Sequence, residues 1–192
     1  RQCLRDLLAN TGVELHVLVM DNGSRDDSVA VLQAEVAAAA AAGRDVELQT
    51  FADNLGFTGA MNHGIAWASA RRLPFTVVLN NDLRLPPDCL RPLLDVLRAD
   101  PRVAAEGPTI LWPDGRVWSQ GGRLGFLPNG LVLSGHGRPP QPPTTGPWAV
   151  EFLTGACLVA LTAELVEVGG FDDAYFMYWE DVDLCCRLRA RG

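Results

Sequence analysis

The chain contains no lysine, and all sixteen of its basic residues are arginine. A Walker A phosphate loop, a pyridoxal Schiff base and a lysine general base each need a lysine side chain, so the sequence excludes these three chemistries. Acidic residues outnumber basic ones, 23 to 16, and the formal charge is −7. Because a surface that follows nucleic-acid phosphates must be basic, we expect no nucleic-acid partner.

Paired cysteines and long apolar runs are also missing. The five cysteines form no CxxC pair and are odd in number, which indicates reduced thiols rather than a disulfide framework. No apolar run approaches the ~20 residues of a membrane span, and no secretory signal opens the sequence. From these absences we expect a soluble cytoplasmic protein. The length of 192 residues is that of one domain, 1–192.

Apolar strands alternate with helical segments along the first hundred residues. Strands are expected at 15–20, 46–51 and 75–79, and helices at 1–9, 60–70, 87–99 and between the turn at 21–24 and Gly43. Ser24 and Asp27 have the spacing of a capping box for the helix that ends at Gly43. Continuous apolar strands between helices are typical of a mostly parallel sheet with helices on both faces. The sequence therefore predicts an α/β fold.

Glycine and proline accumulate after residue 107, and helical periodicity is lost there. We expect extended pieces and a long surface loop over 113–150. Regular structure is expected to return with the apolar run FLTGACLVA at 152–160. An acidic and aromatic stretch, YFMYWEDVDLCCRL, then leads into a helix that begins near Trp179.

Aspartates follow two of the expected strands at the point where each strand ends. Asp21 follows the strand that ends at Met20, and Asp82 follows the strand that ends at Leu79. Ligands of open parallel α/β sheets bind at the carboxyl ends of the strands. Two carboxylates there would repel each other unless a cation or ligand lay between them, and a largely hydrated divalent ion would fit. Aspartate is also an ordinary turn former, so both interpretations stay open for this pair.

Five segments together resemble inverting nucleotide-sugar glycosyltransferases of family 2, which have the GT-A fold. The segments are VMDNGSRDDS, DNLGFTGAMNHGI, VVLNNDLRL, FLTGACLVA and GGFDDAYFMYWEDVDLCCRLRARG. The chain is most similar to the rhamnosyltransferase-like group that builds bacterial cell-wall and surface polysaccharides. The resemblance implies a Rossmann-like sheet, a dTDP-rhamnose or UDP-sugar donor and a saccharide or polyprenyl-linked acceptor. It also implies a divalent cation, Mg²⁺ or Mn²⁺.

The same resemblance implies roles for individual residues. Asp21 would hold the nucleobase or ribose, and Asp82 would bind the metal that neutralises the diphosphate leaving group. Asp181, in the Glu-Asp motif, would be the base that deprotonates the acceptor hydroxyl. Gly155 and Glu180 would bind the acceptor. The other positions that match the donor site are Asn22, Asn54, Gly56, Asn62, Asn80 and Asn81.

The chain departs from the family pattern in two places. Asn80 stands where the metal-binding motif has its first acidic residue, so coordination would rest on Asp82 alone. The sequence also begins inside the helix that follows the family's first central strand, so we expect that strand to be absent from the sheet. A non-catalytic remnant that binds nucleotide sugar weakly is therefore the alternative hypothesis. By the resemblance, 113–150 would lie on the acceptor side, and the protein would associate peripherally with the inner face of the membrane.

Overall fold

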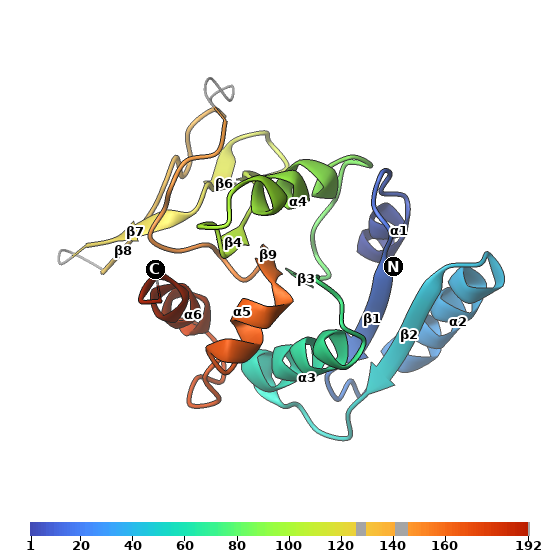
Figure 1. Ribbon diagram of the computed structural model, residues 1–192. Coiled ribbons are helices and arrows are strands. Elements are labelled where there is room, and N and C mark those ends of the chain that lie inside the picture. The colour runs from blue at the N-terminus through green and yellow to red at the C-terminus, as the bar shows by residue number, and fades with distance from the viewer. Residues whose placement is uncertain (126–129, 141–145, 192) are drawn as a thin grey trace.

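The computed structural model describes residues 1–125, 130–140 and 146–191. Its first half alternates helices and strands: α1 (Gln2–Leu8), β1 (His16–Asp21), α2 (Ser28–Ala41), β2 (Asp45–Thr50), α3 (Gly56–Ala70), β3 (Phe75–Leu79) and α4 (Leu90–Ala99) (Figure 1). Short strands follow: β4 (Ala105–Glu106), β5 (Ile110–Leu111), β6 (Val117–Ser119), β7 (Gly122–Leu124) and β8 (Leu131–Leu133). The last elements are β9 (Cys157–Leu161), α5 (Thr162–Glu167) and α6 (Glu180–Arg189).

The strands form mixed sheets rather than the mostly parallel sheet that the alternation predicted. β1 and β2 pair in parallel, with Asp21 opposite Thr50. β9 lies between β3 and β4 and is antiparallel to both. β5–β6 and β7–β8 are antiparallel pairs. The α/β class is confirmed. β9 is antiparallel to β3 because it begins at Cys157, opposite Leu79 at the end of β3, and runs toward the start of that strand.

The strands β1 and β3 belong to different sheets, and no ladder joins them in the described residues. The helix α1 and the turn after it connect the two parts instead. The thiol of Cys3 donates to the backbone oxygen of Asn80 at 3.3 Å. Farther along, the backbone amide of Thr11 donates to Pro87 at 2.7 Å. The interval between β1 and β3 is where the family resemblance places a central strand.

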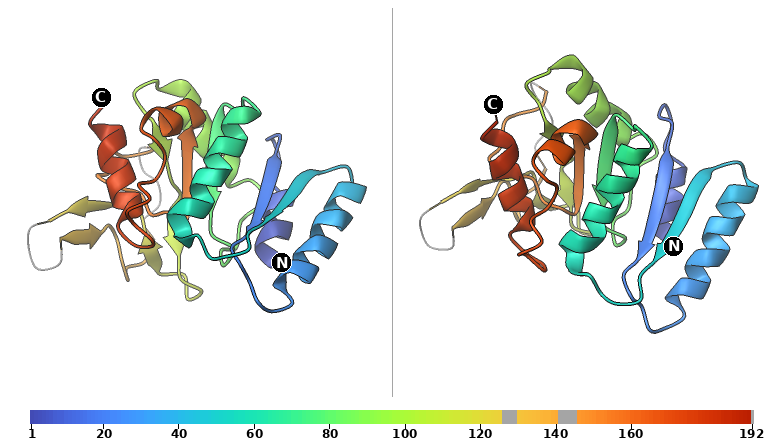
Figure 2. Two further views of the ribbon diagram at one scale, coloured as in Figure 1. Left: turned by 90° about the horizontal axis from the view of Figure 1, so that it is seen from below. Right: turned by 60° about the horizontal axis from the view of Figure 1, so that its bottom comes forward.

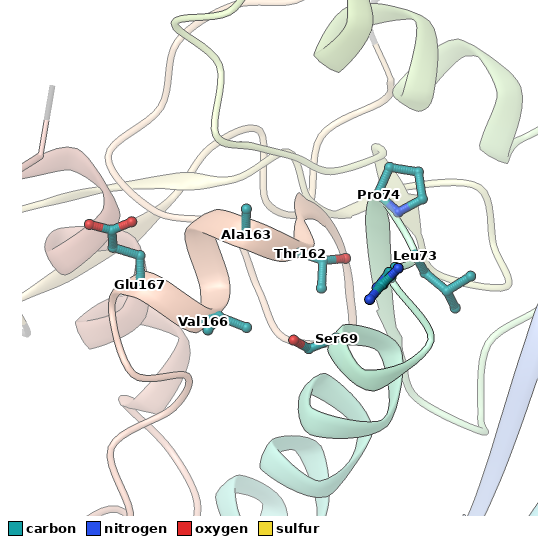
Figure 3. Close-up of a pocket in the computed structure, with 8 residues that line it drawn as sticks. Ser69, Leu73, Pro74, Thr162, Ala163, Val166 and Glu167 are labelled. Atoms are coloured by element: carbon teal, nitrogen blue, oxygen red, sulfur yellow. The ribbon is translucent and has the colours of Figure 1, made fainter.

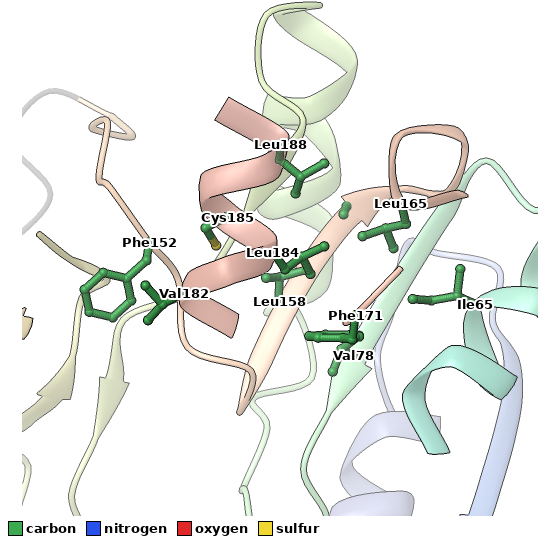
Figure 4. Packing of buried hydrophobic residues seen from close by; sticks show 11 residues of the cluster. Ile65, Val78, Phe152, Leu158, Leu165, Phe171, Val182, Leu184, Cys185 and Leu188 are labelled. Carbon is green, nitrogen blue, oxygen red and sulfur yellow. The ribbon is translucent and has the colours of Figure 1, made fainter. Parts of the chain in front are cut away.

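Helices cover both faces of the sheet that contains β9. Leu158 and Ala160 of β9 pack into a cluster with Leu165 of α5 and with residues of α3 and α6 (Figure 4). Val159 points the other way, against Leu93, Leu94 and Leu97 of α4. Alternating side chains of one strand thus face two different helical layers. The expectation of helices on both faces is confirmed.

The expected capping box is wrong. The helix α2 begins at Ser28, and its N-cap residue Asp27 makes no side-chain cap hydrogen bond. The amide of Ser24 donates instead to the Asp21 carboxylate at 3.0 Å. The reason is geometric: Asp21 ends β1 with its carboxylate buried beside this turn, and it binds the amide before a helix can start.

The glycine- and proline-rich region 113–150 contains extended pieces, as expected, and they are the short antiparallel strands β6, β7 and β8. β7 and β8 form a hairpin that lies at the end of the molecule away from α2 and β2 in both views of Figure 2. Gly122 of β7 also bridges to Phe152, which connects the hairpin to the chain before β9. Parts of the predicted surface loop, 126–129 and 141–145, lie outside the described residues. Among the helices that the structure describes, none has the length and apolar character needed to cross a bilayer.

Candidate functional site

The ends of β1 and β3 and the start of β9 lie at one edge of the molecule. Asn22, after β1, donates through Nδ2 to the backbone oxygen of Gly56 at 2.9 Å, so α3 begins at that edge. α3 runs to the far side and β3 returns. Leu79 then lies opposite Cys157, and the amide of Asn80 donates to Ala156 at 2.9 Å. The expected convergence of strand ends is therefore present.

The predicted donor-site residues after β1 and β2 bind one another. Asn22 also donates to Asn54 Oδ1 at 3.0 Å and accepts from the amide of Leu55 at 2.9 Å. Asn54 Oδ1 accepts from the amide of Gly56 at 2.9 Å as well. Asp21 is buried and accepts from Ser24. These side chains hold the turns at 21–24 and 53–56 together.

Gly56 is required where α3 meets the loop before α6. Its φ is +73°, and a Cβ atom there would lie 2.7 Å from the backbone oxygen of Phe176. The same oxygen accepts from the amide of Phe57 at 2.9 Å, and the hydroxyl of Thr58 donates to Tyr175 at 2.5 Å. The first amides of α3 are thus bound within the protein, which leaves this helix start unsuited to hold an anion.

Asn62 joins α3 to the segment that follows α5. Its Nδ2 donates to the backbone oxygen of Phe171 and to Asp173 Oδ1, both at 2.9 Å, and its Oδ1 accepts from the amide of Phe171 at 2.8 Å. Phe171 is buried and belongs to the main core cluster. The structure therefore gives Asn62 a role in positioning the loop at 171–173.

The turn after β3 exposes the side chains that the sequence assigns to metal and donor. Asn80 is half-buried, whereas Asn81 and Asp82 are exposed. In the described ranges no group of three or more His, Cys, Asp or Glu side chains could hold a metal ion. A single exposed carboxylate suits Mg²⁺ or Mn²⁺ only where diphosphate oxygens and water supply the other ligands. Asp82 is an exposed carboxylate of this kind.

The Glu-Asp motif opens α6 with its two carboxylates in different surroundings. Asp181 Oδ2 accepts from the backbone amide of Gly155 at 2.9 Å, and its Oδ1 accepts from the amide of Val182 at 2.8 Å. Glu180 is only 6% exposed, and its Oε2 has no hydrogen-bond partner among the described residues. Burial raises the pKa of Glu180, and the neighbouring Asp181 carboxylate raises it further.

Two aromatic residues before this motif adopt left-handed backbone conformations. Tyr178 has φ 71° and Trp179 has φ 72°, a region that bulky residues rarely occupy. All four side chains of residues 176–179 are exposed, with Tyr178 at 73%. We call residues 176–179 the aromatic segment. Nothing in the sequence signalled this backbone, although the aromatic residues next to the acidic motif marked the place.

A cavity of about 480 Å³ lies at the opposite side of α3 from this edge (Figure 3). Ser69 at the end of α3, Pro74 before β3 and Thr162 at the start of α5 line it. Gly56 begins α3 and Asn80 follows β3, whereas the cavity lies where α3 ends and β3 begins. The two elements therefore separate the cavity from the candidate site. It takes no part in the candidate site.

Comparison with known proteins identifies the family. Residues 1–139 match the family described as Glycosyl transferase family 2, and the chain belongs to that family. The chain is similar to the mannosyltransferase PcManGT of Pyrobaculum calidifontis, solved in complex with GDP-Man and Mn²⁺, with a TM-score of 0.63 at 17% identity. That likeness covers 94% of this chain and 45% of the other, and it confirms the GT-A fold.

Two curated relatives are similar to nearly the whole of this chain. The N-acetylglucosaminyl-diphospho-decaprenol L-rhamnosyltransferase of Mycobacterium tuberculosis is 33% identical, over 98% of this chain. The O-antigen biosynthesis protein RfbC of Myxococcus xanthus is 30% identical, over 92% of this chain. The chain spans 66% of the length of the first relative and 14% of the second. The resemblance to rhamnosyltransferase-like members of family 2 is confirmed.

Proposed function

We propose that the protein transfers a sugar, with inversion, from a nucleoside-diphosphate donor to a saccharide or lipid-linked acceptor. The donor is dTDP-rhamnose or a UDP-sugar. The family membership and the rhamnosyltransferase named above support the reaction class. The acceptor of that relative, as its name states, carries a sugar on diphospho-decaprenol. A lipid-linked acceptor would bring this protein to the inner face of the membrane.

The observation that carries the proposal is the position of Asp181. Gly155 donates its amide to Asp181, and the next residue, Ala156, accepts the amide of Asn80. Two adjacent residues before β9 therefore join the carboxylate of α6 to the turn that presents Asp82. The two residues proposed as base and metal ligand, about a hundred positions apart in sequence, thus lie at one edge of the fold, which supports the proposal.

Asp181 is the base in this proposal. The amide of Gly155 donates to Oδ2 and so fixes its direction. The other oxygen is bound by the amide at the start of α6, so the side chain is held at two points. A carboxylate fixed in this way takes the proton of the acceptor hydroxyl as that oxygen attacks the anomeric carbon. The attack comes from the face opposite the leaving diphosphate, which inverts the configuration.

The donor would lie against the turns after β1, β2 and β3. Asp21 and Asn22 shape the nucleoside side, and Asn54 and Gly56 form the neighbouring wall. Asp82 would hold a divalent cation, with Asn80 and Asn81 beside it. When bound, the cation neutralises the charge that develops on the leaving diphosphate. Asn62 contributes through the loop at 171–173, which it fixes to α3.

Glu180 would bind the acceptor, but only after a local movement. Its free oxygen Oε2 is covered in this structure, and the residue before it belongs to the aromatic segment. The left-handed conformations of Tyr178 and Trp179 cost roughly 1–3 kcal/mol each. A change of conformation there would release that cost and uncover Oε2. A hydroxyl of the acceptor would then supply the missing hydrogen bond.

The test is the substitution Asp181→Asn in the full-length protein. The neutral amide keeps the size of the side chain but cannot take a proton, so turnover should fall by about 10²–10⁴-fold while donor affinity stays nearly unchanged. Asp183→Asn is the matched control: Asp183 lies two residues away and pairs with Arg187 at 2.7 Å. Retained turnover in Asp181→Asn would contradict the assignment. Donor binding without any transfer by the wild-type protein would favour the non-catalytic alternative.

A further inference from the structure

A second cavity, of about 310 Å³, lies between the β7–β8 hairpin, the segment before Phe152 and the end of α6. Its lining residues are Gly122, Arg123, Ser134, Trp148, Ala149, Val150, Glu151 and Arg189. The hairpin forms one wall, because the amide of Glu151 donates to Gly122 at 2.8 Å. None of the residues that the sequence assigned to the site lies in this cavity.

The two arginines of the cavity have no ion pair within the part of the chain that the structure describes. Their neighbours on α6 behave differently: Arg187 pairs with Asp183 at 2.7 Å, and Arg191 pairs with Glu167 at 2.9 Å. Arg189 lies between these two and has no such carboxylate, nor does Arg123. In a chain of net charge −7, two unpaired guanidinium groups on one cavity favour an anionic ligand.

The remaining side chains of the cavity define the shape of that ligand. Trp148 is 53% exposed and offers an apolar face next to the arginines. Nearby on the hairpin, Leu124 and Val132 are exposed as well. The carboxylate of Glu151 also lines the cavity, but one of its oxygens accepts from the amide of Leu124. The cavity therefore combines two cations, one amide-bound carboxylate and an apolar border, and the excess of positive charge fits an anionic group that carries a hydrocarbon chain.

The cavity lies along α6 from the proposed base. Arg189 follows Asp181 by eight residues, roughly 12 Å along a helix. Burial raises the pKa of the Cys185 thiol to about 11; the charge of Asp181 raises it and the charge of Arg189 lowers it. The hairpin also reaches the aromatic segment, since a Cβ on Gly130 would lie 3.2 Å from the ring of Trp179. One sugar and a diphosphate span a comparable length.

We infer that this cavity binds the diphosphate of a prenyl-diphosphate-linked acceptor, with Arg123 and Arg189 on the phosphates and Trp148 against the first part of the hydrocarbon chain. The inference rests on the proposed function, because it gives the lipid-linked acceptor a place to bind. With the diphosphate held there, the sugar attached to it extends along α6 toward Asp181. The cavity recognises the charged diphosphate of the acceptor, whereas the residues around Glu180 bind its sugar.

The first experiment measures binding without catalysis. Farnesyl diphosphate is titrated into the full-length protein with chelator present, which removes metal-dependent binding at Asp82, and tryptophan fluorescence is recorded. The double variant Arg123→Gln/Arg189→Gln should bind at least about tenfold more weakly than wild type, whereas Arg44→Gln, an exposed arginine in the turn after α2, should bind as wild type does. Farnesol and inorganic diphosphate should each bind much more weakly. Equal binding by the double variant, or equal affinity for inorganic diphosphate, overturns the inference.

The second experiment separates this inference from the proposed function. Transfer is measured to a prenyl-diphosphate-linked acceptor and to a neutral alkyl glycoside of the same sugar. The double variant should raise KM roughly tenfold or more for the first acceptor and leave the second unchanged. An equal change for both acceptors would overturn the inference. If the double variant binds farnesyl diphosphate more weakly than wild type but wild type transfers no sugar, the inferred site stands and the proposed function is contradicted.

Discussion

The predicted donor side and the predicted acceptor side of the molecule differ in how their polar groups are satisfied. On the donor side, Asn22, Asn54 and Asp21 make hydrogen bonds within the protein that build two turns. On the acceptor side, Glu180 is buried and its Oε2 has no hydrogen-bond partner among the described residues, and Tyr178, two positions earlier, has a strained and exposed conformation. The predicted donor side is already formed, whereas the predicted acceptor side keeps, among the described residues, one unsatisfied carboxylate oxygen that a ligand could complete.

The difference shows that residues of the same type, at positions that match the same family motif, can have a structural role or be free to bind a ligand. Asn62 is half-buried and makes three hydrogen bonds, whereas Asn81 is exposed. A motif match alone cannot separate these two asparagines, because both stand at positions that fit the family's donor site. Substitution can separate them, since a structural role changes stability and a binding role changes affinity.

The largest expected change in stability comes from Asn62→Ala. The variant leaves the amide and carbonyl of the buried Phe171 without partners, which should lower the free energy of unfolding by about 2–4 kcal/mol. The melting temperature should fall by roughly 2–4 °C for each kcal/mol, as measured by calorimetry. Asn81→Ala is the control, and it should stay within about 0.5 kcal/mol of wild type. Equal effects of the two substitutions would contradict the structural role of Asn62.

Asp82→Ala should show the opposite behaviour. The side chain is exposed, so its removal should leave the melting temperature nearly unchanged. If Asp82 holds a cation against the diphosphate, donor affinity should fall roughly tenfold or more with Mg²⁺ or Mn²⁺ present and stay the same with chelator. Isothermal titration of the nucleotide sugar measures both conditions. Wild-type affinity that is equal with metal and with chelator would remove the cation from the proposal.

These two substitutions also mark how far the sequence could predict the structure. The strands before Asp21 and Asp82 were found because continuous apolar runs end sharply there, and strand ends of an α/β fold converge. The direction of β9 could not be found, because an apolar run such as 152–160 has no signal for parallel or antiparallel pairing. The backbone of Tyr178 could not be found either, since left-handed aromatic residues exist only where surrounding contacts hold them.

Glu180→Gln tests the free carboxylate through pH. Burial raises the pKa of Glu180 in the folded protein, so the folded state holds its proton to a higher pH than the unfolded chain does. The stability from this difference is present below the ordinary pKa of the side chain and is lost as the pH rises through the raised value. Wild type should therefore lose stability relative to Glu180→Gln as the pH rises above about 4, the ordinary pKa of the side chain. Denaturant unfolding at several pH values measures this difference.

Glu106 provides the control for that measurement. Burial raises the pKa of Glu106 too, but this residue lies in the strand β4 and not in the helix α6. Glu106→Gln should remove a separate share of the same decline, and the double variant should show the sum of the two effects because distant sites are additive. A Glu180→Gln variant whose pH dependence matches that of wild type would show that Glu180 is not held in a charge-disfavouring place.

The smallest expected effect concerns the strained backbone of the aromatic segment. At φ 71°, Tyr178 pays a cost that glycine avoids, and its ring is 73% exposed, so little packing is lost on truncation. Tyr178→Gly should therefore be more stable than Tyr178→Ala by about 1 kcal/mol, a shift of roughly 2–4 °C in melting temperature. Met177, next to it, does not have a positive φ, so Met177→Gly should be less stable than Met177→Ala. If the alanine variant were more stable than the glycine variant at both positions, Tyr178 would not be strained in solution. The release of strain proposed for uncovering Glu180 would then have no source.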